Sequence, residues 1–287
     1  MTFFTITPTI LLKTGSHVII KRMVRKGFTL IELMVTAVIL SVLMAILMPA
    51  LHAARQQARA IECSSSIKEL LLAMTVYGTD NKTLPYGFYD DRNIGPPQGG
   101  YAGNKQFDRT GWWWFNYLDV YFDKNRDRNT LQCPSKCLNN PIFEDYVTCG
   151  NYGINQSICK AVPGRGFRAE FEGVPLSIGS IKSPQRTLLI VDSGYTLINW
   201  WHATQEPPSQ LRSKFIEDTS YIPGLNVNTD REFWPGQETD AFRGRHPRKT
   251  VNIGFVDGHV DRRKADDLLV EKLGDQYKNL SPLWKPK

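Results

Sequence analysis

An uncharged apolar run from Leu33 to Leu51 constrains the fold more than any other part of the sequence. Apolar side chains occupy every face of a helix drawn through this run, so it lacks the single stripe of a helix packed on a soluble core. About 20 helical residues, rising about 1.5 Å each, cross the hydrocarbon layer of a bilayer, which is about 30 Å thick. Basic residues precede the run and predict a cytoplasmic location for that end: Lys21, Arg22, Arg25 and Lys26. The sequence therefore predicts one membrane-spanning helix, with the chain beyond it exported.

One carboxylate, that of Glu32, interrupts the apolar character near the start of this segment. A carboxylate inside a membrane costs about 3 kcal/mol unless a partner stabilises it, and no Lys or Arg lies within reach inside the span. An ordinary signal anchor with a chance Glu is one alternative. A cleaved secretory signal peptide is another, but the apolar run is too long and lacks a small-x-small exit. We therefore treat Glu32 as a functional residue.

The segment from Lys26 to Glu32 resembles the N-terminus of type IV pilins and type II secretion pseudopilins. In that family a prepilin peptidase cuts after a Gly preceded by basic residues, the new N-terminus is N-methylated, and the fifth mature residue is Glu. The resemblance implies cleavage between Gly27 and Phe28, which places Glu32 fifth. Pro49 falls where these proteins often carry a helix-kinking proline.

The resemblance also implies partners and a location. The partners are a prepilin peptidase/N-methyltransferase, other pilin or pseudopilin subunits, and the inner membrane. The partner of Glu32 is implied to be the free amine of Phe28 on a neighbouring subunit, created by cleavage. The single-pass chain is expected in the inner membrane, with its C-terminal domain periplasmic, or extracellular after assembly.

The net charge of +7 comes mostly from the N-terminal leader. Residues 1–26 carry five basic side chains and no acid, which leaves 30 basic and 28 acidic residues in the rest of the chain. No basic patch interleaved with stacking aromatics remains, so we predict no nucleic-acid partner. The leader is longer than prepilin leaders usually need, and we expect Met23 to be the true start, with a genuine long leader as the alternative.

The chain is expected to divide into four parts. These are the basic leader 1–26, the transmembrane and assembly helix 27–50, its amphipathic continuation 51–80, and the exported globular domain 81–287. Apolar residues recur at alternating four and three spacing through the continuation: Leu47, Leu51, Ala54, Ala58, Ile61, Ile67, Leu70, Leu71, Met74 and Tyr77. Turn and C-cap residues at 78–82 end this pattern, which predicts a single helix of about fifty residues.

The globular domain carries strand signals, and the expected fold class is α+β, a long N-terminal helix packed on an antiparallel sheet with long loops. Residues 187–192 predict a central strand that is apolar on both faces. A hairpin is predicted at 244–262, with its turn at Asp257-Gly258. This segment resembles the H-X9-DG domain that accompanies prepilin signals, although ten residues separate His246 from Asp257 here. An amphipathic helix is expected at 265–273.

Three consecutive tryptophans, at 112–114, open a segment that we expect to be helical. Three adjacent rings could form a platform for carbohydrate. Adjacent residues on a helix point in different directions, however, which favours a helix with some of the rings in the core and others at its rim.

Five cysteines lie beyond the span: Cys63, Cys133, Cys137, Cys149 and Cys159. Disulfides persist in an exported compartment, so the sequence favours a disulfide framework. A zinc site built on Cys133-x3-Cys137 is the alternative, but Cys149 and Cys159 lack ligand-like spacing. The resemblance to pseudopilins implies a bridge between Cys63 and Cys133, and the sequence itself leaves the connectivity open.

A run of oxygen side chains resembles a calcium loop, with Asp123, Asn125 and Asp127 at alternating positions. It lacks the Gly and the terminal Glu of such loops, and three basic residues offset its acids. These residues are weak calcium candidates, and we predict no metal site and no cofactor.

Catalysis would need a site gathered from scattered residues: Asp192, His202, His246, Asp257 and His259. Imidazole and carboxylate groups bind divalent metals, but no nucleophile elbow, phosphate loop or two-histidine helix motif fixes their spacing. We therefore expect no enzyme. The predicted function is that of a prepilin-like structural subunit, cleaved and N-methylated, that assembles into a type II secretion pseudopilus or type IV pilus-like filament. The alternative is a membrane-anchored binding or adhesion module for a glycan or surface ligand.

Overall fold

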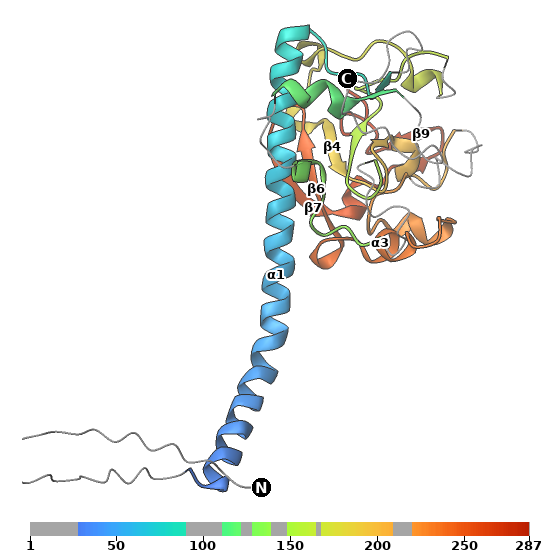
Figure 1. The fold of residues 1–287 in the computed structure, drawn as a ribbon. Coiled ribbons are helices and arrows are strands. Elements are labelled where there is room, and N and C mark those ends of the chain that lie inside the picture. Colours follow the sequence, from blue (N-terminus) through green and yellow to red (C-terminus); the bar gives the residue numbers. More distant parts are fainter. Residues whose placement is uncertain are drawn as a thin grey trace, which may run out of the picture. The chain divides into compact units, whose positions relative to one another are not determined.

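The computed structural model describes residues 28–89, 111–121, 128–138, 148–164, 168–208 and 220–286 (Figure 1). The chain divides into two compact units, residues 1–51 and 52–287. The leader 1–26 and Gly27 lie outside the described residues, as do the calcium candidates Asp123, Asn125 and Asp127.

A single helix of 52 residues, α1 (Leu30–Asn81), confirms the predicted long N-terminal helix. It is long and apolar enough to cross a membrane. The helix continues through Pro49, and the kink expected there remains a prediction. It ends at Asn81, and Lys82 then adopts a positive φ of 67°. The left-handed residue that ends the helix is therefore Lys82, while Gly78 stays inside the helix.

The buried face of α1 differs in part from the predicted stripe. The first half of that stripe is exposed, including Leu51 at 51% and Ile61 at 58%. Burial begins only at Ala60 and then follows a spacing of three and four along the helix, at Ala60, Cys63, Ile67, Leu70, Leu71, Ala73 and Met74. Sequence periodicity shows that a face is apolar, but it does not show which turns have a partner inside the same chain.

The second unit is built around a five-stranded sheet in the order β5-β3-β4-β6-β7. Its strands are β5 (Leu197–Ile198), β3 (Tyr152–Asn155), β4 (Leu188–Asp192), β6 (Thr250–Phe255) and β7 (Val260–Lys264). Three pairings are antiparallel, whereas β3 and β5 run parallel. The fold is α+β, as expected, but the sheet is mixed. The predicted central strand β4 is fully buried, and the predicted β6–β7 hairpin is present.

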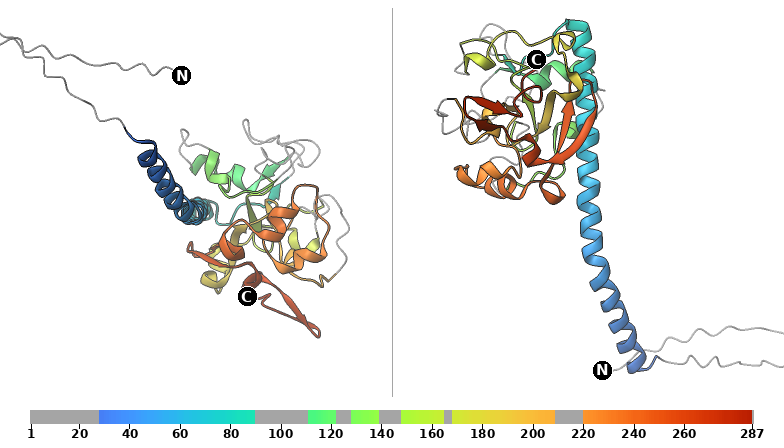
Figure 2. Two further views of the ribbon diagram at one scale, coloured as in Figure 1. Left: turned by 90° about the horizontal axis from the view of Figure 1, so that it is seen from below. Right: turned by 180° about the vertical axis from the view of Figure 1, so that it is seen from behind.

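The part of α1 that carries Ile67 and Leu71 packs against this sheet (Figures 1 and 2). Gly254, on β6, permits the close approach of α1. A Cβ atom added there would lie 2.7 Å from the Leu71 side chain and 2.8 Å from that of Ile67. A second hydrophobic cluster, which includes Phe255 and Trp284, contains other side chains of the sheet and the C-terminal segment. The sheet therefore contributes to two apolar clusters.

The remaining described elements are short. A hairpin of β1 (Phe88–Tyr89) and β2 (Trp112–Trp113) leads into a 3-10 helix, Trp114–Tyr121. Trp113 and Trp114 are each 1% exposed, so two of the three rings belong to the core and the three do not form a surface platform. The short helix α3 (Glu238–Arg243) precedes β6.

The amphipathic helix expected at 265–273 is wrong. Residues Ala265–Leu268 form one 3-10 turn, and the chain then enters strand β8 (Glu271–Leu273), which pairs with β9 (Gln276–Lys278). Gly274 lies between the two strands with a φ of 60°. The turn at Gly274 and the cross-strand pairing therefore override the helical spacing of the apolar residues.

Candidate functional site

The start of α1 holds the predicted processing and assembly residues. Phe28, the predicted first mature residue, is 85% exposed. Thr29 immediately precedes the helix, and its hydroxyl accepts a hydrogen bond from the Glu32 backbone N–H at 3.3 Å. The Glu32 carboxylate in turn accepts from the Thr29 N–H at 2.8 Å and from the Thr29 hydroxyl at 2.9 Å. This reciprocal arrangement is a capping box, which satisfies N–H groups at the start of a helix.

The capping box gives Glu32 a partner within its own helix. An acidic side chain in the first turn is also favoured by the partial positive charge of the helix N-terminus. Both bonds to the carboxylate use Oε2. Thr29-x-x-Glu32 matches the sequence signature of the box, so this contact could have been predicted from the sequence.

All five cysteines are free thiols in the structure. Cys63 and Cys133 are buried, with their sulfur atoms 3.6 Å apart, whereas a disulfide requires about 2.05 Å. The expected bridge between them is therefore not formed here and remains a prediction. Cys137 is exposed, while Cys149 and Cys159 are buried. The zinc alternative built on Cys133-x3-Cys137 gains no support, because Cys137 is not part of the buried group that contains Cys133.

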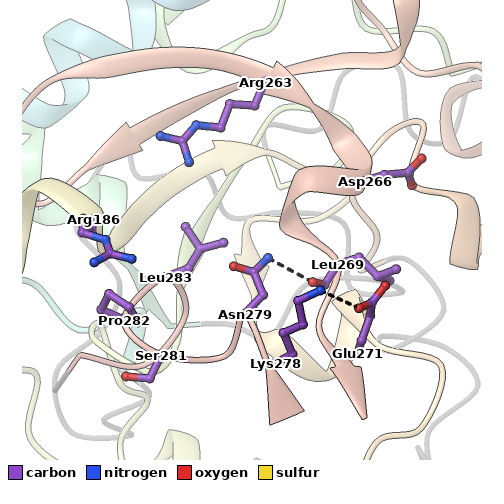
Figure 3. A pocket seen from close by; sticks show the side chains of 10 residues that line it. All are labelled: Arg186, Arg263, Asp266, Leu269, Glu271, Lys278, Asn279, Ser281, Pro282 and Leu283. Carbon is purple, nitrogen blue, oxygen red and sulfur yellow. Dashed lines mark hydrogen bonds and ion pairs between the residues drawn. The ribbon is translucent and has the colours of Figure 1, made fainter. Parts of the chain in front are cut away.

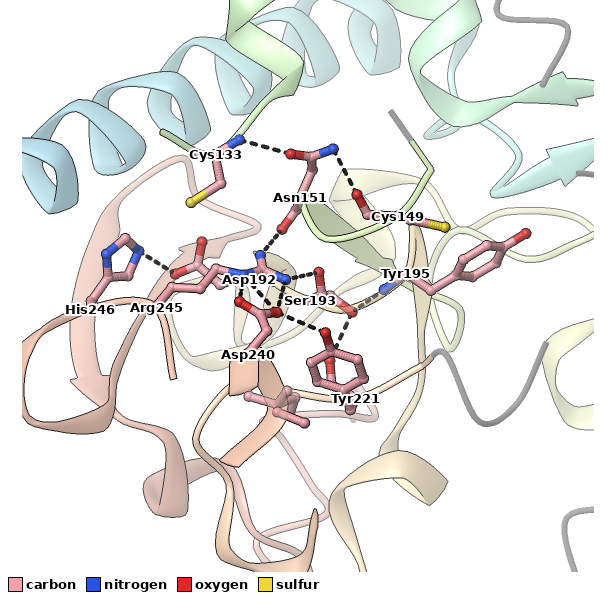
Figure 4. A network of polar contacts seen from close by, with 12 residues as sticks. Cys133, Cys149, Asn151, Asp192, Ser193, Tyr195, Tyr221, Asp240, Arg245 and His246 are labelled. Carbon is pink, nitrogen blue, oxygen red and sulfur yellow. Dashed lines mark hydrogen bonds and ion pairs between the residues drawn. The ribbon is translucent and has the colours of Figure 1, made fainter. Parts of the chain in front are cut away.

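A buried polar cluster, which we call the Cys-Asp-His cluster, comprises Cys63, Cys133, Asp192 and His246. One ligating atom from each residue lies within 4.8 Å of the other three. The Cys63 thiol donates to Asp192 Oδ1 at 3.0 Å, and His246 Nε2 lies 3.1 Å from Asp192 Oδ2. Figure 4 shows the side chains of Cys133, Asp192 and His246 turned toward one another. The carboxylate of Asp192 is the centre of this group.

Four separate parts of the chain supply the cluster. Cys63 lies on the buried face of α1, and Asp192 is the last residue of the central strand β4. His246 precedes β6, and Cys133 follows a 3-10 helix at Arg128–Leu131. The cluster therefore joins α1, the sheet and a connecting segment inside one unit.

Backbone and amide groups hold the cluster in place. The Asn252 N–H donates to Asp192 Oδ2 at 2.7 Å, and the Asn252 side-chain amide lies 3.1 Å from His246 Nε2. The same amide donates to the Ala60 carbonyl of α1 at 3.3 Å. The Cys133 N–H donates to Asn151 Oδ1 at 2.9 Å. These contacts within the chain help to hold Asp192, His246 and Cys133 in position.

A buried ion pair lies next to the cluster. Arg245 donates through Nε and Nη2 to the Asp240 carboxylate, with a closest approach of 2.7 Å, and both side chains are fully buried. Arg245 also donates to the backbone carbonyls of Asn151 and Ser193, each at 2.7 Å. Tyr221 completes the pair by donating its hydroxyl to Asp240 at 2.8 Å (Figure 4). The guanidinium and carboxylate are thus fully paired, as buried charges must be.

The cluster strongly perturbs the ionisation of its members. Burial alone would lower the pKa of His246, but the adjacent Asp192 carboxylate and Cys133 raise this pKa to about 9. Burial would raise the pKa of Asp192, but His246, Arg245 and the Asn252 N–H lower it. Burial raises the pKa of Cys63, and its neighbours Cys133 and Asp192 raise it further. Burial would raise the pKa of Cys133, but its hydrogen bonds with Cys63 and His246 lower it to about 6.

The five residues considered for a catalytic site do not gather in one place. Only Asp192 and His246 meet, in the Cys-Asp-His cluster. His202 lies in a separate capping box, where its Nδ1 accepts from the Asn199 N–H. Asp257 and His259 form a partly exposed pair in the β6–β7 turn, at 2.6 Å. The His and Asp of the H-X9-DG-like motif therefore lie on either side of β6, one before the strand and one after it.

The turn of the hairpin contacts α1. Gly258 has a φ of 88°, which favours glycine, and its carbonyl accepts a hydrogen bond from the Lys68 ammonium group. The ring of His259 stacks on Phe255 with centroids 4.3 Å apart. These contacts explain Asp257, Gly258 and His259 as parts of a turn that packs beside the helix.

A surface hollow of about 470 Å³ lies beside the β8–β9 hairpin (Figure 3). Its lining mixes basic and acidic side chains: Arg186, Arg263, Lys278, Asp266 and Glu271. Several of these charges are already paired, Lys278 with Glu271 at 3.4 Å and Arg263 with Asp261 at 2.8 Å. The mixed lining selects no class of ligand, so the hollow is a weaker candidate than the buried cluster.

Comparison with known proteins agrees with the reading of the N-terminus. Residues 22–48 match the family described as the prokaryotic N-terminal methylation motif. Residues 52–125 match a family described as a protein of unknown function (DUF1559). No curated protein and no solved structure matches the chain.

The chain thus carries an N-terminal methylation motif at the start of a long apolar helix, an arrangement similar to that of prepilin-like proteins. The motif followed by a DUF1559 segment is consistent with a type II secretion pseudopilin-like protein. Neither match reaches residues 244–262, so the likeness of that hairpin to an H-X9-DG domain stays a prediction.

Proposed function

We propose that the chain is a structural subunit, cut after Gly27 and N-methylated on Phe28, that assembles with other subunits into a pseudopilus or pilus-like filament. The observation that carries this proposal is the methylation motif at 22–48 on a helix whose apolar side chains are exposed from Phe28 to Leu51. Prepilin peptidase is the processing enzyme that such a motif implies. The inner membrane holds the subunit before assembly.

The exposed surface of α1 supports this role. Every residue from Phe28 to Arg59 is exposed, including Leu33 at 65%, Leu47 at 63% and Leu51 at 51%. Burying apolar surface contributes about 25 cal/mol per Å², so such a helix is stable only with lipid or with other apolar helices around it. A filament of packed N-terminal helices supplies that environment outside the membrane.

Glu32 is the proposed assembly residue. Cleavage after Gly27 leaves Thr29 in place, so the capping box survives processing, and it creates a new amine on Phe28. That amine on a neighbouring subunit is the proposed partner of the Glu32 carboxylate. The box engages Oε2, which leaves Oε1 as the proposed acceptor for the neighbour.

We propose a structural role rather than a catalytic one for the globular unit. Its candidate catalytic residues occur in three separate local arrangements, and two of these are a capping box and a turn. The exported side is proposed to be the periplasm.

The capping box allows the charge of Glu32 to be separated from its role in starting the helix. Glu32→Gln retains the box, since Gln also serves at this position, but removes the charge. Thr29→Val removes the hydroxyl and keeps the charge. Glu32→Ala removes both functions of the side chain. The full-length wild type and these three variants are expressed in cells with a prepilin peptidase and the other subunits.

Two measurements distinguish the roles: N-terminal sequencing of the membrane-bound chain, and cross-linking between subunits. We expect all four chains to be cut at Gly27. Thr29→Val should assemble like the wild type, Glu32→Gln should assemble less well, and Glu32→Ala should remain in the inner membrane. Normal cross-linking of Glu32→Ala would reject the pairing and favour a membrane-anchored binding module.

A further inference from the structure

The Cys-Asp-His cluster brings together four metal-ligating side chains, and neither family match gives it a role. We propose that Cys63, Cys133, Asp192 and His246 bind one zinc-class divalent cation as a closed structural site. The site lies inside the second unit and does not depend on the proposed role in assembly. No spacing in the sequence relates these four residues. The cysteine pattern favoured bridges, with zinc at Cys133-x3-Cys137 as the alternative, and Asp192 and His246 belonged to a separate set of catalytic candidates.

The spacing of the four side chains fits a tetrahedral metal site. Zinc binds sulfur at about 2.3 Å and nitrogen or oxygen at about 2.0–2.2 Å, so ligand atoms at the corners of the tetrahedron lie about 3.3–3.8 Å apart. The two sulfur atoms are 3.6 Å apart, which agrees with such an edge. The contacts from Asp192 to Cys63 and to His246, at 3.0 and 3.1 Å, are slightly shorter. These two contacts use different oxygens of Asp192, and one ligating atom from each residue lies within 4.8 Å of the other three, so small adjustments of the side chains would place a cation between all four.

The donor types select the class of metal. Two thiolates and an imidazole favour zinc and similar borderline or soft cations, whereas magnesium and calcium prefer sites made of oxygen. With both thiols deprotonated, His246 neutral and Asp192 ionised, the ligands carry three negative charges. A divalent cation compensates two of these in a place that water does not reach, since all four residues are buried.

The surroundings supply the outer shell that such a site needs. The Asn252 N–H holds Asp192 Oδ2 at 2.7 Å, while Oδ1 lies 3.0 Å from the Cys63 sulfur. The Asn151 side chain holds the backbone N–H of Cys133. Outer-shell contacts of this kind orient ligands and tune their affinity for the metal.

The burial of all four ligands and their origin in four segments indicate a structural role. A closed site with four protein ligands leaves no position for substrate, which distinguishes structural zinc from catalytic zinc. The cation would tie the buried face of α1 to the end of β4 and to the two segments that carry Cys133 and His246. Because metal binding to such a site is coupled to folding, the globular unit should be less stable without the metal.

A Cys63–Cys133 disulfide is the competing chemistry at the same atoms. Its formation requires the two sulfur atoms to approach from 3.6 Å to about 2.05 Å. Both thiols lose their protons and two electrons pass to an oxidant, so the sulfur atoms no longer serve as thiolate ligands. One chain therefore holds the metal or the bridge, and the two states are separable by intact mass.

The test uses the full chain purified in detergent, with zinc measured by elemental analysis and thiols counted without reductant. The variants are Cys63→Ser and His246→Gln. Cys159→Ser is the matched control, because Cys159 is also a buried free thiol but lies outside the cluster. We expect one zinc per chain in the wild type and in Cys159→Ser. Loss of a ligand should lower affinity by more than the about 10–100-fold typical of outer-shell changes.

Cobalt provides a measurement that does not depend on the folding of the variants. Cobalt bound to the wild-type chain should show the intense charge-transfer absorption of thiolate ligands, and zinc should abolish it. A wild-type chain that takes up neither metal would overturn the proposal. So would zinc content that is equal in all variants, which indicates an adventitious ion only, or a mass showing a Cys63–Cys133 bridge in the natively purified chain.

Discussion

Two parts of one helix, α1, differ in how far they are buried. From Phe28 to Arg59 every residue is exposed, whereas from Ala60 to Met74 one face is buried in the hydrophobic core of the second unit. Both parts are rich in apolar residues. The difference shows that apolar content alone does not decide burial, because among the described residues only the second part has a complementary surface. The first part needs lipid or other subunits.

A carboxylate lies at each part of the helix, and the two carboxylates have different partners. Glu32 lies on the exposed part and is held by its neighbour Thr29 through a local capping box. Asp192 is fully buried and lies against Cys63 of the second part, with His246 and the Asn252 N–H as further partners. A local contact leaves Glu32 available to another subunit. The enclosed contacts of Asp192 can serve only the interior of the same chain.

The largest expected effect concerns processing of the exposed part. Gly27 has no Cβ, so the backbone can approach the peptidase closely, and Gly27→Val should leave the leader attached. N-terminal sequencing of the membrane fraction measures this directly. A mature chain beginning at Phe28 in this variant would show that the peptidase does not require glycine, and a cut elsewhere would move the predicted site.

A matched pair of truncations compares the buried and the exposed face of α1 where the helix packs on the second unit. Ile67 is 0% exposed and Ile61 is 58% exposed. Ile67→Ala should lower the free energy of unfolding by about 2–5 kcal/mol, because it removes buried methyl groups and leaves a cavity. Ile61→Ala should change it by no more than about 0.5 kcal/mol. Denaturant unfolding of the detergent-solubilised chains measures both values.

The same pair should behave in the opposite way in assembly. If the exposed face of α1 at Ile61 packs against other subunits, Ile61→Ala should weaken cross-linking between subunits while leaving the folded unit intact. Equal losses of unfolding free energy in the two variants would contradict the difference in burial. Unchanged cross-linking of Ile61→Ala would restrict the subunit contacts to the apolar run that precedes it.

Close packing of the second part is tested at Gly254. An added Cβ would lie 2.6–2.8 Å from side-chain atoms of Ile190, Leu71 and Ile67, so neighbouring side chains must shift. Gly254→Ala should therefore lower the free energy of unfolding by about 1–3 kcal/mol. Gly179→Ala is the control, because a Cβ there meets nothing within 4 Å. Similar unfolding midpoints for the two variants would show that the helix can move away from β6 at little cost.

The parts of the fold that were predicted depend on signals close together in the sequence. The apolar run and its stripe predicted α1, the continuous apolar residues predicted β4, and Asp257-Gly258 predicted the β6–β7 turn. The helix expected at 265–273 was wrong because its spacing was local, whereas the structure there depends on pairing between β8 and β9. The extent of the buried stripe was also wrong, since burial depends on where the sheet ends.

The two candidate sites also differ in whether their residues lie close together in the sequence. Gly27, Phe28 and Glu32 form one short motif, which the sequence displays directly. The Cys-Asp-His cluster draws on positions from Cys63 to His246, and no spacing in the sequence relates them. Only the sheet, which places Asp192 beside the segment before β6, brings these residues to the buried face of α1. Such a site requires the fold before it can be seen.

The last prediction concerns the acid sensitivity of the second unit, through His202. Burial, with a further effect of the nearby Arg231, lowers the pKa of His202 to about 3 in the folded chain. In the unfolded chain the pKa is about 6.5. The fold therefore favours neutral His202, and its contribution is complete above pH 6.5 and is lost as the pH falls from 6.5 toward 3. The loss approaches about 1.4 kcal/mol per pH unit.

His202→Gln tests this effect, because the Gln side-chain oxygen can replace Nδ1 as acceptor of the Asn199 N–H. Between pH 6.5 and 4 the free energy of unfolding should fall less steeply in His202→Gln than in the wild type. His52→Gln, a change at an exposed histidine of α1, is the matched control and should follow the wild type. Equal slopes for wild type and His202→Gln would mean that the buried imidazole accepts a proton without cost. The difference between the buried groups of the second unit and the exposed part of α1 would then not hold, because the buried His202 would accept a proton as readily as an exposed histidine.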